Sequence, residues 1–436
     1  MYIRKIAITG IKCFKTKMKM DFTNKDGGVN LWNVIVSENG GGKSTLLQAV
    51  ALALLNTEEI ADLEELLKYD LANIDSVLKL EAWPSVGQSE GRVVAEISPG
   101  KTRSTEITQV EYRISRKPFL QDHIRYLNSW EWGQNDFAVG YGPFRRIGED
   151  SDKRQDPSGH HFVHYNRESI GHGFGSLFDH RYPLIFIDQF DDIHYNTKNH
   201  FLQSMFPDNI NYIAGNNEYL ETVDGFVPAT NLSDGYRTIL ALVSDITARM
   251  SEAYGHQSNI PYGQAGEILA EGAVLIDEID AHLHPRWQQR IGAVLTKKFP
   301  NIQFIVATHS PFIPQVVGKG GSSVHALRRT KKGLVSSKAV EDFSLWQTDQ
   351  ILIELFGLNT TFSQEIDEEI GEFHELYKSD SLEKQEEKLE RLEDALDKKL
   401  RQADLATEEV DRIRELVREL AFLWNRGSKR SQRSKG

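Results

Sequence analysis

The sequence predicts an α/β fold, because three apolar segments typical of buried strands each end in polar residues that suit the edge of a sheet. The first segment runs into a glycine-rich loop and then a helix. The second ends in adjacent carboxylates, and the third ends in a histidine. The three segments are residues 31–36, 272–280 and 304–311.

Composition places the chain among globular proteins. Its 436 residues suffice for two ordinary domains or for one large α/β domain with an insertion. Hydrophobic residues make up 39% of the chain, but no apolar run reaches the roughly 18 residues that a membrane-spanning helix needs. The formal charge of −12 argues against a protein that coats nucleic acid.

The first residues and the single cysteine indicate the compartment. Residues 1–14 alternate in hydrophobicity and carry charge at Arg4 and Lys5, which is typical of a first strand and not of a signal peptide. Cys13 is the only cysteine, so no disulfide can form within the chain, and a small buried hydrophobe is its expected role. The sequence therefore predicts a cytoplasmic protein.

Residues 37–45 (SENGGGKST) predict a phosphate-binding loop. Glycines leave room for backbone N–H groups to converge on phosphate oxygens, and the N-terminus of the following helix adds partial positive charge. Lys43 would reach the β- and γ-phosphates of a nucleotide, and Ser44 would place its hydroxyl on Mg²⁺. The residues expected to contact nucleotide are Asn39, Gly40, Gly41, Gly42, Lys43, Ser44 and Thr45.

Ser37 departs from the usual form of this loop, which begins with glycine. The alternative interpretation is a flexible glycine turn that happens to precede lysine and serine. The context favours the phosphate loop, because an apolar strand precedes it and apolar residues at helical spacing follow it from Leu46 to Leu54.

Asp277 and Glu278 follow the apolar part of the second segment. Adjacent side chains leave a strand in different directions, so two neighbouring acids can take two roles. We expect Asp277 to bind Mg²⁺ and Glu278 to polarise the water that attacks the γ-phosphorus. Many strands end in acids, so this pattern gains its weight from the segments around it.

His309 ends the third strand-like segment and is suited to contacting the γ-phosphate. The alternative is a histidine whose hydrogen bonds are satisfied at a strand end. His282 and His284 have a spacing that occurs in metal sites, but no cysteine or third histidine completes such a site. A structural role at a subunit contact is expected for them.

A serine before a predicted helix completes the set. Ser233, Asp234 and Gly235 precede an apolar helical stretch at residues 238–246. A serine hydroxyl, free backbone N–H groups and the helix dipole suit an anion. Taken alone, this pattern is a helix N-cap. Together with the other segments, it predicts a contact to the γ-phosphate held by another subunit.

In order, these segments resemble the Walker A loop, the signature motif, Walker B with its D-loop, and the H-loop of ABC-type ATPase heads of the RecF/SMC kind. Residues 232–237, 275–288 and 299–312 are especially similar to a subgroup of stand-alone bacterial ATPases classed as AAA-type. This subgroup includes PtuA of the Septu anti-phage system and ATPases associated with retrons. Residues 141–146 (YGPFRR) are similar to a segment of the same subgroup.

The resemblance implies a P-loop NTPase with the two-lobed fold of an ABC head at residues 1–317, including a poorly legible insertion at about 80–230. It also implies ATP and Mg²⁺ as ligands, ATP hydrolysis, and a head-to-head dimer. Gln189 is the candidate for the family's Q-loop glutamine. A strand and helical extension at 318–425, with its apolar stripes at 382–425, is expected to serve docking or oligomerisation, and 426–436 form a basic, disordered tail.

Three functions follow from the resemblance. The leading one is an ATP-gated clamp that controls a separate effector, such as an HNH nuclease, in bacterial anti-phage defence. The second is a RecF-like ATPase that binds DNA during repair. The third is the cytosolic ATPase of a transporter. It is the weakest, because Asp234-Gly235-Tyr236 stands where transporters favour Gly-Gly-Gln.

Overall fold

A computed structural model of the chain shows two compact units, Met1–Gly357 and Leu358–Gly436. Nearly all of the residues that the structure describes belong to the first unit. The described residues are 1–56, 58–61, 63, 79–101, 106–119, 122–133, 135–143, 145, 147–148, 173–178, 185–186, 211–213, 219–222, 225–228, 233–256, 259–264, 266–315, 321–329, 335–340, 346 and 348–358.

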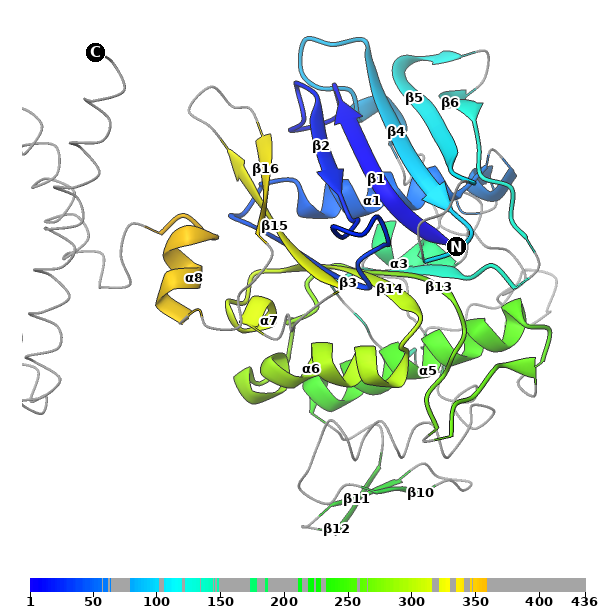
Figure 1. The fold of residues 1–436 in the computed structure, drawn as a ribbon, viewed down its shortest axis with the longest axis vertical. Helices are drawn as coiled ribbons and strands as arrows, with labels where there is room; N and C mark the ends of the chain where they lie inside the picture. The colour runs from blue at the N-terminus through cyan, green and yellow to red at the C-terminus, as the bar shows by residue number, and fades with distance from the viewer. Residues whose placement is uncertain are drawn as a thin grey trace, which may run out of the picture. The chain divides into compact units, whose positions relative to one another are not determined.

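The first unit stacks two sheets with a helix between them and two further helices beneath the second sheet (Figure 1). The first sheet is antiparallel and has the strand order β2-β1-β4-β5-β6. The second has the order β16-β15-β3-β14-β13-β7 and is parallel except for the edge strand β16. The strands are β1 (Tyr2–Thr9), β2 (Met18–Asp21), β3 (Trp32–Ser37), β4 (Glu90–Ser98), β5 (Thr108–Phe119), β6 (Asp122–Asn128), β7 (Ala138–Tyr141), β13 (Gly272–Ile276), β14 (Ile302–Thr308), β15 (Ser322–Arg329) and β16 (Val335–Val340).

Helix α1 (Lys43–Leu54) lies between the two sheets, where its leucines and alanines are buried on all sides. A helix that is apolar all round is stable only inside a core. Helices α5 (Asp234–Ala253) and α6 (Pro285–Lys298) cover the opposite face of the second sheet. Successive strand residues point to opposite faces, so Ile35 of β3 packs with α1 while Val34 and Val36 pack with the α5 and α6 layer. The fully apolar strand segments of the sequence therefore reflect burial on both faces.

The parallel strands place the predicted site residues at one edge of the second sheet. Thr308 of β14 is paired with Val36 of β3, and Val306 of β14 with Ile276 of β13. Ile276 is also paired with Tyr141 of β7. The carboxyl ends of four parallel strands therefore meet at the same edge, and ligands of open α/β sheets bind outside such ends.

Two element boundaries refine the sequence predictions. Helix α5 begins at Asp234 and not at residue 238, so the Ser233 segment forms the start of the helix itself. Strand β15, which follows residue 318, pairs with β3 inside the second sheet. The predicted helices at 382–425, the basic tail and Gln189 lie outside the described residues. The remaining elements are η1 (Leu80–Ala82), β8 (Ile147–Gly148), α3 (Gly175–Phe178), β9 (Ile185–Phe186), β10 (Asn211–Ile213), β11 (Tyr219–Thr222), β12 (Gly225–Pro228), α7 (Phe312–Gln315) and α8 (Thr348–Glu354).

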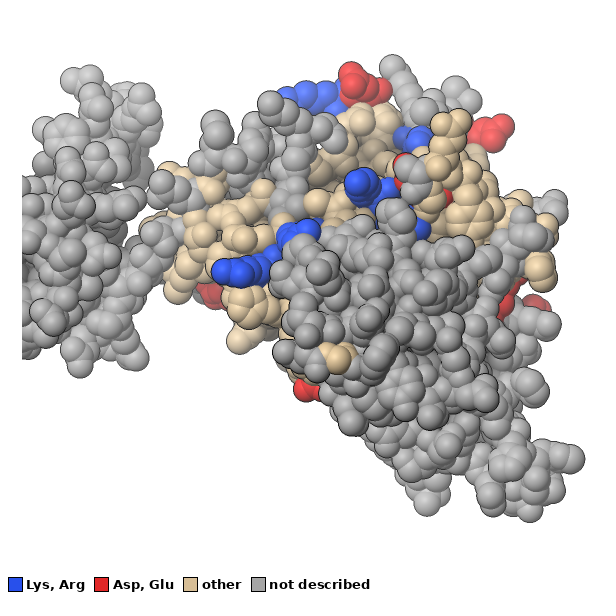
Figure 2. Space-filling model, turned by 90° about the horizontal axis from the view of Figure 1, so that it is seen from below, with Lys and Arg blue, Asp and Glu red and all other residues tan. Residues whose placement is uncertain are grey.

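The surface seen in Figure 2 carries lysine, arginine and acidic side chains in small groups. Within the described residues of that face, no large patch of a single charge forms. Among the described residues, no helix is long and apolar enough to cross a membrane.

His325 makes the stability of the first unit sensitive to acid. It is 1% exposed in β15, and its Nε2 lies 2.9 Å from the Ser323 hydroxyl, which donates to Asn33 Oδ1. Burial lowers the pKa of His325 to about 4, so the neutral imidazole is the folded form. The unfolded chain binds this proton near pH 6.5. The contribution of His325 to the free energy of unfolding is therefore fully present well above pH 6.5. It declines by about 3 kcal/mol as the pH falls to 4.

Urea unfolding of wild type and His325→Gln between pH 4 and 7 measures this effect. The variant should be less stable at pH 7 but should lose less stability on acidification. An equal pH dependence in both proteins would contradict the assignment.

Candidate nucleotide-binding site

The glycine-rich loop after β3 has a backbone that only glycine fits at two points. Gly40 and Gly42 have φ angles of 73° and 97°, in the left-handed region. A Cβ atom on Gly42 would also lie 2.6 Å from Cys13 Sγ and 2.7 Å from Phe14 Cζ. Gly42 is the N-cap of α1, so the loop turns directly into the start of that helix, as expected for a phosphate-binding loop.

Ser37, the departure from the usual loop, has a role in this structure. It is the buried last residue of β3, where the extended backbone does not require glycine. Its hydroxyl donates to the carbonyl of Glu38 (2.8 Å) and accepts from Lys43 Nζ (3.2 Å). The same hydroxyl lies 2.4 Å from the place of a Cβ on Gly41, so Gly41 must be glycine where Ser37 is serine.

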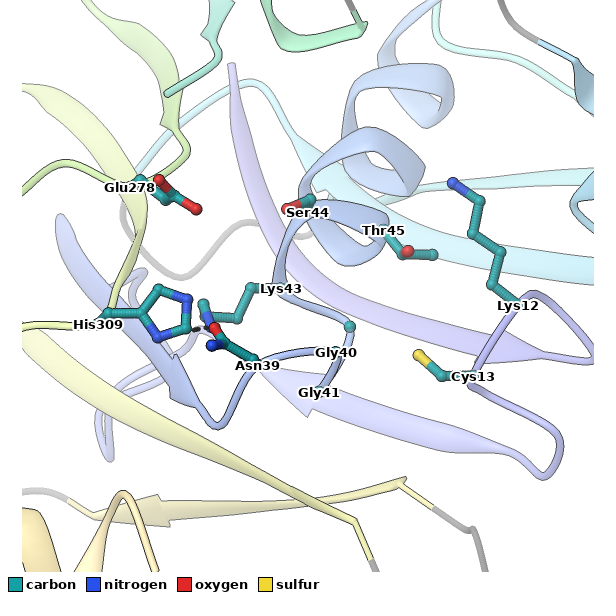
Figure 3. Close-up of a pocket in the computed structure, with 11 residues that line it drawn as sticks. Lys12, Cys13, Asn39, Gly40, Gly41, Lys43, Ser44, Thr45, Glu278 and His309 are labelled. Carbon is teal, nitrogen blue, oxygen red and sulfur yellow. Dashed lines mark hydrogen bonds between the residues drawn. The ribbon is translucent and has the colours of Figure 1, made fainter. Parts of the chain in front are cut away.

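A pocket of about 330 Å³ opens above this loop (Figure 3). All seven predicted loop residues line it, together with the predicted catalytic residues Glu278 and His309. Glu278 and His309 follow β13 and β14, the two strands next to β3 on one side. The lining residues are Lys12, Cys13, Asn39, Gly40, Gly41, Gly42, Lys43, Ser44, Thr45, Glu278 and His309.

The Lys43 ammonium group lies at the centre of this pocket. Nζ donates to the Ser37 carbonyl (3.1 Å) and lies 3.5 Å from His309 Nδ1. Burial lowers the pKa of Lys43, although Asp277 and Glu278 oppose this shift. Its hydrogen-bond partners, Ser37 and His309, are neutral groups, so this ammonium is suited to bind an anion.

Asp277 and Glu278 occupy the turn after β13. Asp277 is 4% exposed; burial raises its pKa, while the neighbouring Ser44 hydroxyl and Lys43 oppose this rise. Asp277 Oδ1 accepts from the Glu278 backbone N–H (3.1 Å). Glu278 has a φ of 45°, a left-handed conformation that is uncommon outside glycine. The turn sends Glu278 into the pocket and leaves Asp277 behind it, beside Ser44.

His309 is fixed through its backbone by the loop that follows β13. Asp280 Oδ1 accepts from the Thr308 hydroxyl (2.5 Å) and from the His309 N–H (3.3 Å). Burial and then Lys43 lower the pKa of His309, so its imidazole is neutral at pH 7. Because Nδ1 faces the Lys43 ammonium, a neutral ring carries its proton on Nε2. The site thus holds a histidine that can donate one hydrogen bond.

The Ser233 segment does not join this pocket. Ser233 is the N-cap of α5 but makes no capping hydrogen bond with its hydroxyl, and both Ser233 and Asp234 are exposed. Gly235 is buried, and a Cβ atom at this position would lie 2.7 Å from Trp287 Cζ3 and 2.8 Å from the His282 carbonyl oxygen. Within the described part of the chain, the pocket over Lys43 has no contribution from this segment.

The two other histidines lie in the segment between β13 and α6, where the His282 carbonyl packs against Gly235. His282 is exposed and has a φ of 64°. His284 is the N-cap of α6, and its Nδ1 accepts from the Arg286 N–H (3.3 Å). Among the described residues, no group of three or more metal-ligating side chains is found.

Sequence reasoning did not identify three of the residues at the site. Lys12 and Cys13 line the pocket from the loop after β1, which the fold brings beside the loop after β3. Lys12 stacks over the Trp83 ring at 4.2 Å, and burial lowers its pKa. Arg145 lies beneath the turn that carries Glu278. Lys12 and Cys13 have no local sequence signal, whereas Arg145 lies in the segment 141–146 whose similarity to the subgroup gave it no predicted role.

A nucleoside triphosphate with Mg²⁺ fits these residues. Backbone N–H groups of a glycine-rich loop, a helix start and an ammonium group suit a polyphosphate. The Ser44 hydroxyl and the Asp277 carboxylate are adjacent oxygen donors of the kind that would suit Mg²⁺. Two protein oxygens agree with the usual binding of Mg²⁺ through one or two side chains plus phosphates.

Comparison with known proteins decides the family. Residues 77–313, more than half of the chain, match the family described as "AAA domain, putative AbiEii toxin, Type IV TA system". The chain belongs to this family. The resemblance to ABC-type ATPases of this group is confirmed, and so is the α/β P-loop fold class.

Two relatives and one solved structure illustrate the range of similarity. Septu protein PtuA of Bacillus mycoides (strain KBAB4) is 28% identical over 412 residues, which cover 91% of this chain and 50% of that protein. Retron Vc95 probable ATPase of Vibrio cholerae serotype O1 biovar El Tor is 51% identical over 83 residues, 19% of this chain and 15% of that protein. The SMC head domain from Thermotoga maritima covers 78% of this chain and all of that one, with 14% identity and a TM-score of 0.43. The chain thus spans half the length of the PtuA that it matches.

Cys13 offers a direct probe of this pocket, because it is the only cysteine and lines the pocket next to Gly42. A maleimide should label the thiol slowly, since burial raises its pKa. At an ATP concentration about ten times Kd, labelling should slow by about tenfold. Mass spectrometry gives the rate, Cys13→Ser is the unlabelled control, and an unchanged rate would show that ATP does not occupy this pocket.

Proposed function

We propose that this protein binds and hydrolyses ATP with Mg²⁺ as a head-to-head dimer, and that it controls a partner effector in bacterial anti-phage defence. One observation carries the proposal. Lys43, Glu278 and His309, which are far apart in the sequence, meet in a single pocket at the ends of three neighbouring strands. The constellation suits phosphoryl transfer, in which catalysis consists mainly of positioning and charge stabilisation.

Each residue has a proposed role in hydrolysis. Bound ATP and Mg²⁺ supply the phosphoryl group and the neutralising charge. Lys43 and the loop N–H groups would bind phosphate oxygens, and Ser44 and Asp277 would hold the metal ion. Glu278 accepts a proton from the attacking water. His309 would donate from Nε2 to an oxygen of the γ-phosphate, and ADP would be the leaving group.

The exposure of the Ser233 segment supports a dimer with shared sites. Ser233, Asp234 and Gly235 do not line the pocket of their own chain. The Ser233 hydroxyl makes no capping hydrogen bond, so it is available to an anion brought by another molecule. A two-fold axis would place this segment of each chain over the nucleotide of the other. We propose that Ser233, Asp234 and Gly235 bind nucleotide in this way.

The role in defence rests on the relatives. Similarity to Septu protein PtuA extends over 91% of this chain, and a retron ATPase matches part of it. We propose a separate effector, such as an HNH nuclease, and assign its docking to the helices predicted at 382–425. Affinity purification from cells should recover this effector with the full chain. A chain ending at Ser381 should bind ATP but lose the effector.

Mg²⁺-dependent release of phosphate from ATP tests the proposed activity. Glu278→Gln keeps the size of the side chain but removes the base, so hydrolysis should fall by about 100-fold or more while ATP stays bound. Glu81→Gln, at an exposed position that does not line the pocket, is the control and should hydrolyse ATP normally. Equal hydrolysis by wild type and Glu278→Gln would refute the assignment.

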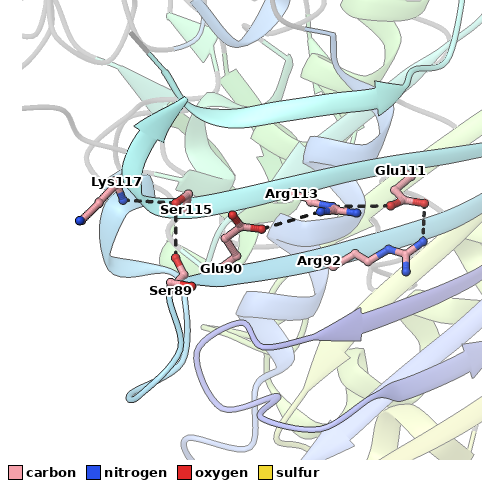
Figure 4. A network of polar contacts seen from close by, with 7 residues as sticks. All are labelled: Ser89, Glu90, Arg92, Glu111, Arg113, Ser115 and Lys117. Carbon is pink, nitrogen blue, oxygen red and sulfur yellow. Dashed lines mark hydrogen bonds and ion pairs between the residues drawn. The ribbon is translucent and has the colours of Figure 1, made fainter. Parts of the chain in front are cut away.

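A DNA-binding ATPase is the second candidate, and one surface feature favours it. Arg92, Arg113 and Arg125 lie directly opposite one another on β4, β5 and β6. Glu90 and Glu111 form ion pairs with the first two (Figure 4), while Arg125 forms none within the described part of the chain. Like charges that face each other across strands are destabilising, and the two carboxylates offset this repulsion for Arg92 and Arg113, which leaves Arg125 as the arginine of the three most suited to a phosphate.

Binding to duplex DNA at several salt concentrations separates the two candidates. A RecF-like role predicts affinity that falls steeply with salt and weakens when Arg92, Arg113 and Arg125 are changed to glutamine. Affinity that is negligible at 150 mM salt, about the physiological level, would favour the defence role with a separate effector.

A further inference from the structure

The guanidinium group of Arg145 is buried under the turn that carries Glu278. Arg145 is 2% exposed and follows β7. Nη1 donates to the carbonyls of Gly142 (3.0 Å) and Asp277 (2.8 Å). Nη2 donates to the carbonyls of Glu278 (3.0 Å) and Ile279 (3.4 Å). One side chain therefore binds three consecutive carbonyl groups after β13.

This turn has a backbone that needs external support. Glu278 has a φ of 45°, which is unfavourable for a residue with a side chain. In an extended strand, successive carbonyl groups point to opposite sides, so three of them can meet one guanidinium only in a turned conformation. Without Arg145, the carbonyl groups of Asp277 and Ile279 would lose their hydrogen bonds to this guanidinium, and a relaxed backbone would be favoured.

The surrounding contacts leave this support to Arg145 and three backbone bonds. The Asp277 N–H donates to the Tyr141 carbonyl (2.7 Å), and the Ile279 N–H donates to the Ala307 carbonyl (3.0 Å). Both hold the flanks of the turn. The Glu278 N–H donates to Asp277 Oδ1, and the Glu278 carbonyl accepts from Arg145 and from the Ala281 N–H (2.9 Å). The carbonyl groups of Asp277 and Ile279 accept from Arg145.

We propose that Arg145 is a positioning residue that holds this turn in its left-handed form and so keeps Glu278 directed into the nucleotide pocket. The inference rests on the proposed ATPase function. Arg145 does not line the pocket, so it acts through Glu278 and not on the nucleotide. Its loss would therefore affect hydrolysis far more than binding.

Lysine cannot replace arginine in this place. A guanidinium is planar and offers five N–H donors in a fixed fork, whereas an ammonium offers three donors at one point. Burial lowers the pKa of Arg145 to about 10, and the nearby Asp280, Asp277 and Glu278 favour the charged form. The group is thus charged at neutral pH, and Arg145→Lys keeps the charge while it removes the fork.

The first test measures ATP hydrolysis and the affinity for a fluorescent ATP analogue in Arg145→Lys. We expect kcat to fall by about 10- to 100-fold, with less than about a twofold change in Kd. Arg4→Lys is the control, since Arg4 is also buried and donates to a backbone carbonyl, that of Gly27, but does not line the pocket. Unchanged kcat in Arg145→Lys, or a parallel loss of kcat and affinity, would overturn the proposal.

The second test needs no hydrolysis. Hydrogen exchange of the nucleotide-free protein should become faster in a peptide covering residues 277–283 of Arg145→Lys, and unchanged in one covering 37–54. Arg145→Gln serves if the lysine variant does not fold. Unchanged exchange at 277–283 would overturn the positioning role, even if wild type proved not to be an ATPase.

A double variant separates this inference from the proposed function. In a Glu278→Gln background, Arg145→Lys should cause no further loss of hydrolysis, because the residue through which it acts is already removed. Independent, multiplicative losses would contradict the proposed route. If Glu278→Gln hydrolysed ATP like wild type, the proposed function would fail instead, and the exchange result would still decide the role of Arg145 in the turn.

Discussion

Lys43→Ala should abolish ATP binding at micromolar concentrations. Lys43 is 5% exposed, and its ammonium lies between the Ser37 carbonyl and His309 at the centre of the pocket. The loss of charged hydrogen bonds to phosphate there is worth about 3 kcal/mol or more, which raises Kd by about 100-fold or more. The loss should appear in the heat of ATP binding measured by titration calorimetry.

Lys298→Ala provides the matched control. Lys298 is also largely buried and has a lowered pKa caused by burial, but its Nζ donates to the Gly266 carbonyl and does not line the pocket. It should bind ATP with wild-type affinity after correction for the folded fraction. Normal affinity in a folded Lys43→Ala protein is incompatible with a phosphate-binding role for this loop.

The sequence was most informative where chemistry and fold are local. Residues 39–45 form the loop within one short segment, so their spacing alone predicted both the turn and the helix that begins at Lys43. Glu278 and His309 were predicted because each follows an apolar strand, and parallel strands bring their ends to the same edge. The structure adds why Ser37 is compatible with the loop: it ends a strand, and its hydroxyl contacts Lys43.

The sequence was least informative where contacts join distant segments. Arg145 lies in the segment 141–146 whose similarity to the subgroup was noted, but its role was not predicted, because the carbonyl groups that it binds are more than 130 residues away and leave no pattern near it. Lys12 and Cys13 join the pocket only because β1 and β3 lie in stacked sheets. The apolar period of α5 is visible only from residue 238, since the polar residues of its exposed first turn hide it, although the sequence did indicate Ser233 as the N-cap.

Ser233→Arg should lower the rate of ATP hydrolysis by more than about 100-fold, while each chain should still bind ATP through Lys43. An arginine at this exposed helix start would obstruct the nucleotide of the opposing chain, but it lies outside the pocket of its own chain. Ser251→Arg, near the other end of α5, is the control and should hydrolyse ATP normally. Normal hydrolysis by Ser233→Arg would exclude shared sites.

Mixing two inactive variants tests the arrangement further. In a heterodimer of Glu278→Gln and Ser233→Arg, one site lacks both groups and the other site is intact. Random exchange in an equal mixture makes half of the dimers mixed, so about a quarter of wild-type activity should return if the sites act independently. Distinct affinity tags on the two chains show that mixed dimers have formed.

The loop after β13 contacts two functional parts of the same chain. Through Asp280 it binds the end of β14 at His309, and through the His282 carbonyl it packs under Gly235 at the start of α5. A movement of this loop would therefore transmit the occupancy of one chain's pocket to the surface that it offers to the other. In a dimer with shared sites, such a connection makes ATP binding cooperative. The rate of hydrolysis would then rise with ATP concentration with a Hill coefficient above 1, up to a limit of about 2 for two sites.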